Sequence, residues 1–208
     1  MVANPNYDAQ VCGLTFDEKV AFFFGNTPTP VLTGCIYSTL AHILSDIREC
    51  ADAGSNKLAF PRAMCLMVAI DLLAKMHAGS DANGVGRRFI NFTEYALQGS
   101  KFGTDIGQKI YEFRNALHHS YRLPTAWKPK GVSGNSSWRF RLVEDQSESK
   151  LTWDTPDNCT FINLYRLQEE IAAAVGRFQS LVAGYSTPDD QLKFSSMFNK
   201  YGWLYVGE

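Results

Sequence analysis

The segment Ile106-Gly-Gln-Lys-Ile-Tyr-Glu-Phe-Arg-Asn-Ala-Leu-His-His-Ser-Tyr121 decides the fold class, because its apolar residues recur at helical spacing. They follow one another at intervals of four, three, four and four residues and predict one buried helix face: Ile106, Ile110, Phe113, Leu117 and Tyr121. Pro124 ends this predicted helix. The same stretch carries an arginine, an amide and two of the four histidines of the chain.

Helical periodicity extends outward from this segment in both directions. The spacing of apolar residues predicts further helices at about 33–53, 62–78, 87–97 and 161–183. The helix at 62–78 is apolar almost all round, as expected of the central helix of a bundle. A helical tail is predicted over about 188–208, with a helix over 188–201 and a surface extension over 202–208.

One stretch departs from the helical pattern. Residues 138–143 alternate apolar with basic side chains, which is the two-residue period of a strand. A turn-like stretch follows at 145–149, and 150–153 is expected to be the returning strand. The sequence therefore predicts a mainly α protein, an up-and-down helical bundle with a β-hairpin inserted at about 136–154, in a single domain spanning 1–208.

Composition narrows the class of protein. The chain has 208 residues, of which 45% are hydrophobic and 20% charged, an ordinary globular balance. No apolar run approaches the roughly 18 residues of a membrane span, and residues 1–10 do not resemble a secretory signal. Five cysteines with no C-x-x-C pair predict reduced, mostly buried thiols in a cytoplasmic protein without a structural zinc site: Cys12, Cys35, Cys50, Cys65 and Cys159.

Charge is unevenly distributed, although the net charge of the chain is only −1. The window 101–141 holds eight basic residues against Asp105 and Glu112, a net charge of +6, so the remaining residues sum to −7. Either this window is an ordinary solvated surface, or it attracts a polyanion such as nucleic acid.

The arginine and the two histidines of this segment point in different directions around the predicted helix. At about 100° per residue, His118 lies roughly 40° from Arg114, whereas His119 lies roughly 140° from it. Asn115 and His119 are four residues apart and share a ridge. Cleavage of RNA without a metal needs an acid, a base and positive charge on the phosphate, which histidine and arginine supply. The alternative is a helix end whose basic side chains only offset the helix dipole.

Arg114-Asn115-x-x-x-His119 resembles the R-x4-H signature of the HEPN superfamily, including the polar residue that commonly follows the arginine. With Tyr121 it is similar to the R-x4-H-x-Y form of HEPN toxins from HEPN/nucleotidyltransferase toxin–antitoxin pairs. The likeness is good over about 60–121 and looser over 161–183. The resemblance implies a helical bundle that forms a homodimer, with the motif helices of both subunits lining one cleft.

The same resemblance implies roles for individual residues. Arg114 would bind phosphate, Asn115 would support it and His119 would be the acid or base, with His118 as possible support. Tyr121 would match a tyrosine that a partner nucleotidyltransferase modifies with AMP, but its place on the apolar stripe is equally consistent with a core role. The inserted hairpin is a departure from the minimal bundle.

The functional prediction is a metal-independent endoribonuclease that cleaves RNA by 2′-hydroxyl attack in bacterial defence or a toxin–antitoxin system, without a cofactor. A non-catalytic HEPN module that binds nucleotide, RNA or a protein partner is the alternative. The predicted RNA-binding side chains are basic: Lys109, Arg122, Lys128 and Lys130. Trp127, Trp138 and Trp153 either stack on unpaired bases or pack the hairpin. The isolated His42 and His77 are expected to be structural.

Overall fold

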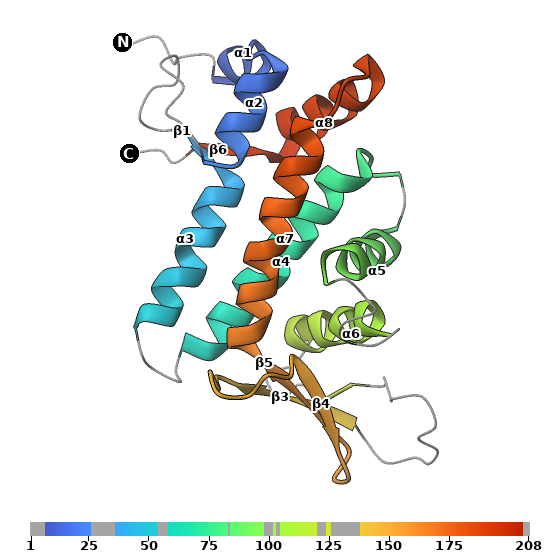
Figure 1. Cartoon of the computed structure of the whole chain (residues 1–208). Coiled ribbons are helices and arrows are strands. Elements are labelled where there is room, and N and C mark those ends of the chain that lie inside the picture. Colours follow the sequence, from blue (N-terminus) through green and yellow to red (C-terminus); the bar gives the residue numbers. More distant parts are fainter. Residues whose placement is uncertain are drawn as a thin grey trace.

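The computed structural model of the protein is mainly helical. A small four-stranded sheet lies at one end of it (Figure 1). The structure describes residues 7–25, 36–53, 58–82, 84–97, 102, 105–119, 124–125 and 138–205. A mainly helical fold with a small β element is therefore confirmed.

Eight helices lie within the described residues: α1 (Tyr7–Cys12), α2 (Phe16–Phe23), α3 (Thr39–Asp52), α4 (Ala59–Ala78), α5 (Val85–Ala96), α6 (Ile106–His119), α7 (Leu164–Ala183) and α8 (Pro188–Tyr201). The strands of the same residues are β1 (Ile36–Ser38), β2 (Pro124–Thr125), β3 (Trp138–Val143), β4 (Thr152–Thr155), β5 (Cys159–Asn163) and β6 (Trp203–Tyr205).

The central position of α4 follows from its apolar sequence. Ala63, Leu66 and Leu73 are fully buried on this helix, and α3, α5 and α7 all pack against it. Figure 1 shows α3 running from the β1–β6 end towards the four-stranded sheet, while α4 and α7 run back in the opposite direction. The helices α5 and α6 lie across this direction, one above the other.

Two short N-terminal helices, α1 and α2, are additions to the predicted set. Helix α2 begins with a capping box, in which Thr15 accepts a hydrogen bond from the Glu18 amide and Glu18 accepts one from the Thr15 amide. Helix α3 starts later than predicted because Ser38 caps it, accepting a 3.1 Å hydrogen bond from the Ala41 amide. The same hydroxyl donates to the Phe23 carbonyl oxygen at 2.6 Å and so joins α2 to α3.

The C-terminal tail differs from the prediction. Helix α8 ends at Tyr201, and the next residues form β6, which pairs antiparallel with β1 instead of extending over the surface. The Tyr205 ring stacks on Tyr7 at a centroid distance of 4.7 Å. Alternating aromatic and apolar side chains at 203–205 favour this strand, and the pairing links two segments far apart in the sequence.

The predicted β-hairpin is wrong in its pairing, although β3 and β4 are both strands. They are not neighbours, because β5 lies between them in the order β2–β3–β5–β4. Strand β5 pairs parallel with β3 and antiparallel with β4. The true hairpin is β4–β5, and its tight turn ends at Asn158, whose positive φ of 58° suits a three-residue hairpin loop. The long helix consequently begins at Leu164 rather than at 161.

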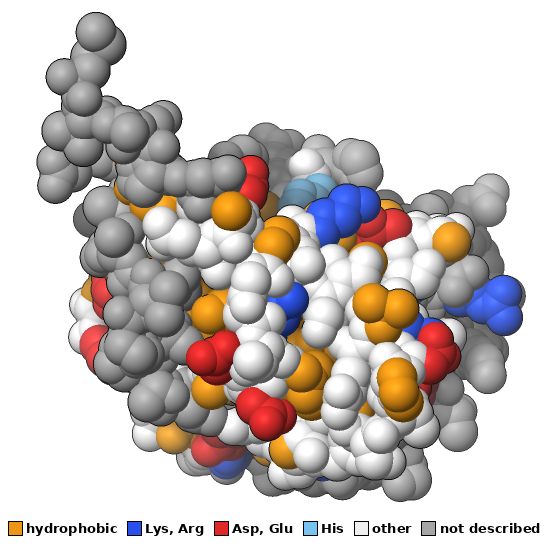
Figure 2. Space-filling view, turned by 90° about the horizontal axis from the view of Figure 1, so that it is seen from above, with side chains coloured by type: hydrophobic (Ala, Val, Ile, Leu, Met, Phe, Trp, Pro, Cys, Tyr) orange, Lys and Arg blue, Asp and Glu red, His pale blue; other side chains and the backbone are white. Residues whose placement is uncertain are grey.

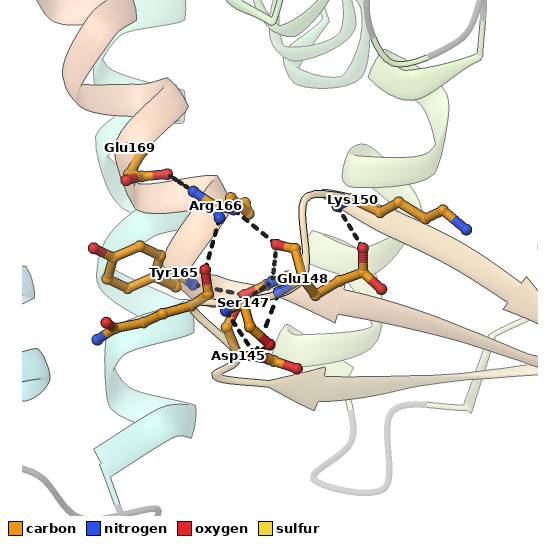
Figure 3. Close-up of polar contacts among 9 residues, drawn as sticks. Asp145, Ser147, Glu148, Lys150, Tyr165, Arg166 and Glu169 are labelled. Carbon is orange, nitrogen blue, oxygen red and sulfur yellow. Dashed lines mark hydrogen bonds and ion pairs between the residues drawn. The ribbon is translucent and has the colours of Figure 1, made fainter.

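The loop between β3 and β4 is fastened to the start of α7 (Figure 3). The Asp145 carboxylate accepts hydrogen bonds from the amides of Ser147 and Glu148 and forms a local turn. Arg166 of α7 donates to the carbonyl oxygens of Glu148 and Gln146 at 2.8 and 2.7 Å. These bonds fix the sheet to the helical part of the molecule.

The opposite end of the molecule is shown from above in Figure 2. Acidic, basic and hydrophobic side chains are interspersed on its described surface, and no continuous basic area is visible there. None of the helices within the described ranges is long and apolar enough to cross a membrane.

Candidate functional site on helix α6

Helix α6 presents the motif residues because its apolar stripe is firmly buried. Ile106, Ile110 and Phe113 have no exposed surface, and Leu117 has almost none, so the predicted stripe is confirmed for the part of the helix that is described. The Phe113 ring contacts Phe140 of β3 edge to face at 5.4 Å. Helix α6 is thus packed between α5 and the sheet, which fixes the direction of its other side chains.

The start of α6 is also held by a specific contact. The Gly107 amide donates a 2.8 Å hydrogen bond to the Glu94 carboxylate of α5. An anion is favourable at this position because helix N-termini carry unpaired N–H groups. A side chain at residue 107 would overlap with Glu94 and with the Ile90 carbonyl oxygen, so glycine allows α5 and α6 to approach closely.

Arg114 is the best-anchored charged group of the motif. Its Nη2 donates to Oδ2 of Asp71 on α4 at 3.1 Å, and its guanidinium carbon lies 5.9 Å from the ring centroid of Phe89 on α5. The side chains of Arg114 and Asp71 are only 19% and 24% exposed. The Nε of Arg114 is buried without a hydrogen-bond partner among the described residues. Arg114 is therefore an ordered cation at the junction of three helices, with a small accessible part.

Asn115 and His118 lie beside this arginine in different environments. The Asn115 Oδ1 is 3.4 Å from Arg114 Nη1, at the long end of hydrogen-bonding distance, and the residue is half-buried. His118 is exposed on the last turn of α6. An exposed imidazole is accessible to solutes, as an acid or base must be.

His119 is the last residue of α6, but its side chain lies outside the part of the structure that is described. Tyr121, Arg122, Lys128 and Lys130 also lie outside the described residues. The structure places Arg114 and Asn115 next to each other on α6, which ends at His119, and the roles predicted for all of these residues stay predictions.

Lys109, the first of the predicted RNA-binding residues, occupies a different environment. It is only 8% exposed, and its Nζ forms an ion pair with Asp154 of β4 at 3.3 Å. Asp154 also accepts a hydrogen bond from Thr160 at 2.5 Å, and Thr160 accepts one from the Trp138 indole at 2.9 Å. This polar chain, buried at Lys109, Thr160 and Trp138 and exposed at Asp154, joins α6 to the sheet. A phosphate would have to displace Asp154 to reach the Lys109 ammonium.

Asp71 and Phe89 are the partners that sequence reasoning missed. Asp71 is the one acidic residue in the sequence of α4, which is otherwise strongly apolar. Such a carboxylate needs a cation or hydrogen bonds wherever it is removed from water. The lone acid was therefore a usable signal for a charged partner on a neighbouring helix.

The other histidines and the tryptophans divide between structural and surface positions. His77 packs against Tyr95, Phe92 and Phe178, and burial lowers its pKa, as expected of a structural histidine. His42 is exposed.

Trp138 is buried in the sheet, which excludes base stacking on its ring, and Trp127 lies outside the described residues. Trp153 is half-buried on the sheet.

The cysteines are less uniformly buried than predicted. Cys159 is buried and Cys12 is exposed, while Cys50 and Cys65 are intermediate, and all four are free thiols. Burial raises the pKa of Cys65 and of Cys159, which opposes thiolate formation. Among the residues that the structure describes, no His, Cys, Asp or Glu cluster of three or more could hold a metal ion.

Comparison of the chain with family models, with curated proteins and with solved structures gave no match. The residues of α6, their partners and the R-x4-H pattern are therefore the features that bear on function.

Proposed function

We propose that the chain is a HEPN-like, metal-independent endoribonuclease whose site is built at the end of α6. The observation that carries the proposal is the position of Arg114, which is ordered by Asp71 and Phe89 two turns or less before the end of α6 at His119. A fixed guanidinium is suited to phosphate because its donors are pre-oriented and its charge is permanent.

The proposed reaction is an internal transfer of the RNA phosphate. A base removes the proton of a 2′-hydroxyl, the 2′-oxygen attacks the adjacent phosphorus, and the bond to the 5′-oxygen breaks. An acid protonates the leaving 5′-oxygen, and the other product carries a 2′,3′-cyclic phosphate. His119 is assigned the acid or base role, Arg114 stabilises the charge on the phosphate, and Asn115 supports the arginine.

The proposal includes a homodimer, which the geometry of one ideal helix supports. Residues five apart point roughly 140° from each other, so Arg114 and His119 of one subunit do not face the same phosphate. In a twofold dimer the two helix ends would share one cleft, and each phosphate would meet groups from both subunits. The up-and-down HEPN arrangement of a single domain is part of the same proposal.

The biological setting is proposed from the sequence pattern. A cytoplasmic RNA-cleaving protein of this type suits bacterial defence or a toxin–antitoxin pair, with a cognate antitoxin or nucleotidyltransferase as partner. Arg122, Lys128 and Lys130 would add positive charge for RNA, and Tyr121 would be the residue that such a partner modifies.

A second candidate is a non-catalytic HEPN module that binds RNA, nucleotide or a protein. The ion pair between Arg114 and Asp71 favours it, because a phosphate must compete with a carboxylate that already holds the guanidinium. In this case the motif arginine would stabilise the packing of α4 and α6 and would take no part in a reaction.

Cleavage assays in EDTA separate the two candidates. Wild-type protein should cut single-stranded RNA to fragments with cyclic phosphate ends, and Arg114→Ala should lower the rate by roughly two powers of ten or more. Arg48→Ala is the matched control, because Arg48 is an exposed arginine on α3. Binding of RNA without any cleavage would support the second candidate, and a monomer in light scattering would contradict the shared cleft.

A further inference from the structure

The face of the four-stranded sheet that points away from α6 carries two arginines and two aromatic rings. On β3, Trp138 and Phe140 are buried on the side of α6, whereas Arg139 and Arg141 alternate with them and are exposed. Arg141 pairs in register with Phe161 of β5, and Phe161 pairs with Trp153 of β4. We call the row Arg141, Phe161 and Trp153, together with Arg139, the outer sheet face.

The three side chains of this row form one continuous stack. The Trp153 and Phe161 rings are parallel, with an interplanar angle of 4° and a centroid distance of 5.1 Å. The Arg141 guanidinium carbon lies 5.7 Å from the Phe161 ring centroid. Strand β4 is an edge strand, so Trp153 ends the stack. Among the described residues Phe161 is the ring that stacks on Trp153, and the half-buried indole keeps part of its surface in contact with solvent.

Acidic groups oppose this positive charge only in part. The Asp154 carboxylate belongs to the inner face, where it binds Lys109 and Thr160. Asp157 lies in the β4–β5 turn, accepts a hydrogen bond from the Thr155 hydroxyl and is close enough to Arg141 for their charges to interact. Asp154 is exposed as well, but Lys109 balances its charge, so the two arginines are opposed by Asp157 alone and the outer sheet face keeps a positive balance.

We propose that the outer sheet face binds single-stranded RNA, with an unpaired base stacked on Trp153 and the neighbouring phosphates paired with Arg139 and Arg141. Aromatic rings that are partly accessible, as the half-buried Trp153 is, can stack on unpaired bases, and exposed arginines on the same face neutralise the backbone. A duplex keeps its bases stacked inside and cannot offer one to Trp153. The choice of RNA over DNA rests on the proposed function, whereas the stacking argument does not.

This surface is connected to the motif helix through the sheet. Phe140 contacts Phe113, and Asp154 contacts Lys109, so two residues of α6 are fixed to the strands that carry the stack. RNA bound on the outer sheet face would be held on an element that is rigidly packed against α6. The surface would then raise the local concentration of RNA near the end of that helix.

Binding should be measured by fluorescence anisotropy with a labelled oligoribonucleotide of about 12 nucleotides. Its 2′-oxygens should be methylated, because this removes the attacking hydroxyl and separates binding from cleavage. Trp153→Ala should weaken binding by about 5- to 100-fold, the usual value of one stacked base. Trp153→Phe keeps an aromatic face and should stay within about threefold of wild type.

Arg141→Ala tests the charge without removing the terminal ring. It should weaken binding and flatten the log–log salt dependence by about 0.7, the contribution of one phosphate on a single strand. Matched controls are Tyr205→Ala, an aromatic residue that is 48% exposed on β6, and Arg48→Ala on α3. Both controls should leave the affinity and the salt slope unchanged.

The outcomes distinguish this inference from the proposed nuclease activity. Reduced affinity in the Trp153 and Arg141 variants, with no cleavage of unmodified RNA by wild type, keeps the RNA-binding face and overturns the nuclease. Cleavage by wild type with unchanged affinity in both variants overturns the RNA-binding face alone. Absence of RNA binding by wild type also overturns it, and equal affinity for single-stranded DNA would remove the preference for RNA.

Discussion

Arg114 of α6 and Asp71 of α4 form an ion pair at 3.1 Å that joins the motif helix to the central helix of the fold. The pair is partly buried, so solvent screens it less than a surface pair. Phe89 lies beneath the guanidinium and restricts its position further. Arg114, the residue proposed to bind phosphate, thus also contributes to the packing between helices.

A double-mutant cycle should measure the coupling of this pair. Asp71→Asn, Arg114→Gln and the double variant should give a coupling free energy of about 1 kcal/mol in urea unfolding. This value lies above that of most exposed pairs because the two side chains are mostly shielded from water. The exposed pair Asp189–Lys193 on α8 is the control and should give less than about 0.5 kcal/mol. Equal coupling in the two pairs would contradict the shielding argument.

His77 should make stability depend on pH. Burial among Phe92, Tyr95 and Phe178 lowers its pKa below the usual value of about 6.5. The unfolded chain therefore binds a proton at His77 at a pH where the folded protein does not. The contribution of His77 is fully present above about pH 6.5, and it is lost as the pH falls from there through the lower folded-state pKa.

Urea unfolding at pH 7.5 and pH 5.5 tests this effect. Wild type should lose stability between the two values, and His77→Gln should lose less, because it has no proton to bind at this position. His42→Gln removes an exposed histidine from α3 and should keep the wild-type difference. An unchanged difference in His77→Gln would assign the acid sensitivity to other groups.

Two glycine-to-alanine substitutions should change stability in opposite directions. Gly79 ends α4 with φ of +62°, and a Cβ there would lie 2.9 Å from the Cβ of Lys193. Gly79→Ala should therefore destabilise the protein by about 1–2 kcal/mol through backbone strain and overlap. Gly176 lies inside α7 with open space around it, and Gly176→Ala should stabilise by about 0.5–1 kcal/mol. Thermal unfolding of both variants measures the two changes in stability, which should have opposite signs.

The sequence predicted the long helices well because their apolar stripes are long enough to show a period. The stripe of α6 and the all-apolar character of α4 both correspond to buried residues. Strand β5 was not predicted, since five mostly buried residues at 159–163 show neither a helical nor a strand period. The Pro156-Asp157-Asn158 turn before it was the available signal, because these residue types favour tight turns.

The sequence predicted the charged residues of α6 at the candidate site but not the residues that pair with them. The pattern of α6 identifies Arg114, but nothing in local spacing indicates that Asp71, 43 residues earlier, is its partner. The same limit explains why the ion pair of Lys109 was not predicted, because its partner Asp154 lies on a strand of the sheet. Pairings between distant elements depend on tertiary packing, which one-dimensional periodicity does not contain.

Two adjacent histidines of α6, His118 and His119, are candidates for the acid or base in the proposed cleavage. Helical geometry pairs Arg114 with His118, four residues on and nearly on the same face. The R-x4-H pattern selects His119 instead, and a shared cleft in a dimer removes the need for both groups to lie on one face of a single helix. Alanine substitutions at these two adjacent residues should therefore differ in their effect on cleavage.

We expect His119→Ala to lower RNA cleavage in EDTA by roughly two to four powers of ten, the usual contribution of a positioned general acid or base. His118→Ala should cost about tenfold or less, because His118 would only assist. Neither histidine belongs to the apolar stripe of α6, so both variants should keep the wild-type circular dichroism spectrum. His118→Ala is thus the matched control for His119→Ala. Loss of cleavage in His118→Ala, with activity retained in His119→Ala, would reverse the assignment and would favour a site formed on one face of one subunit.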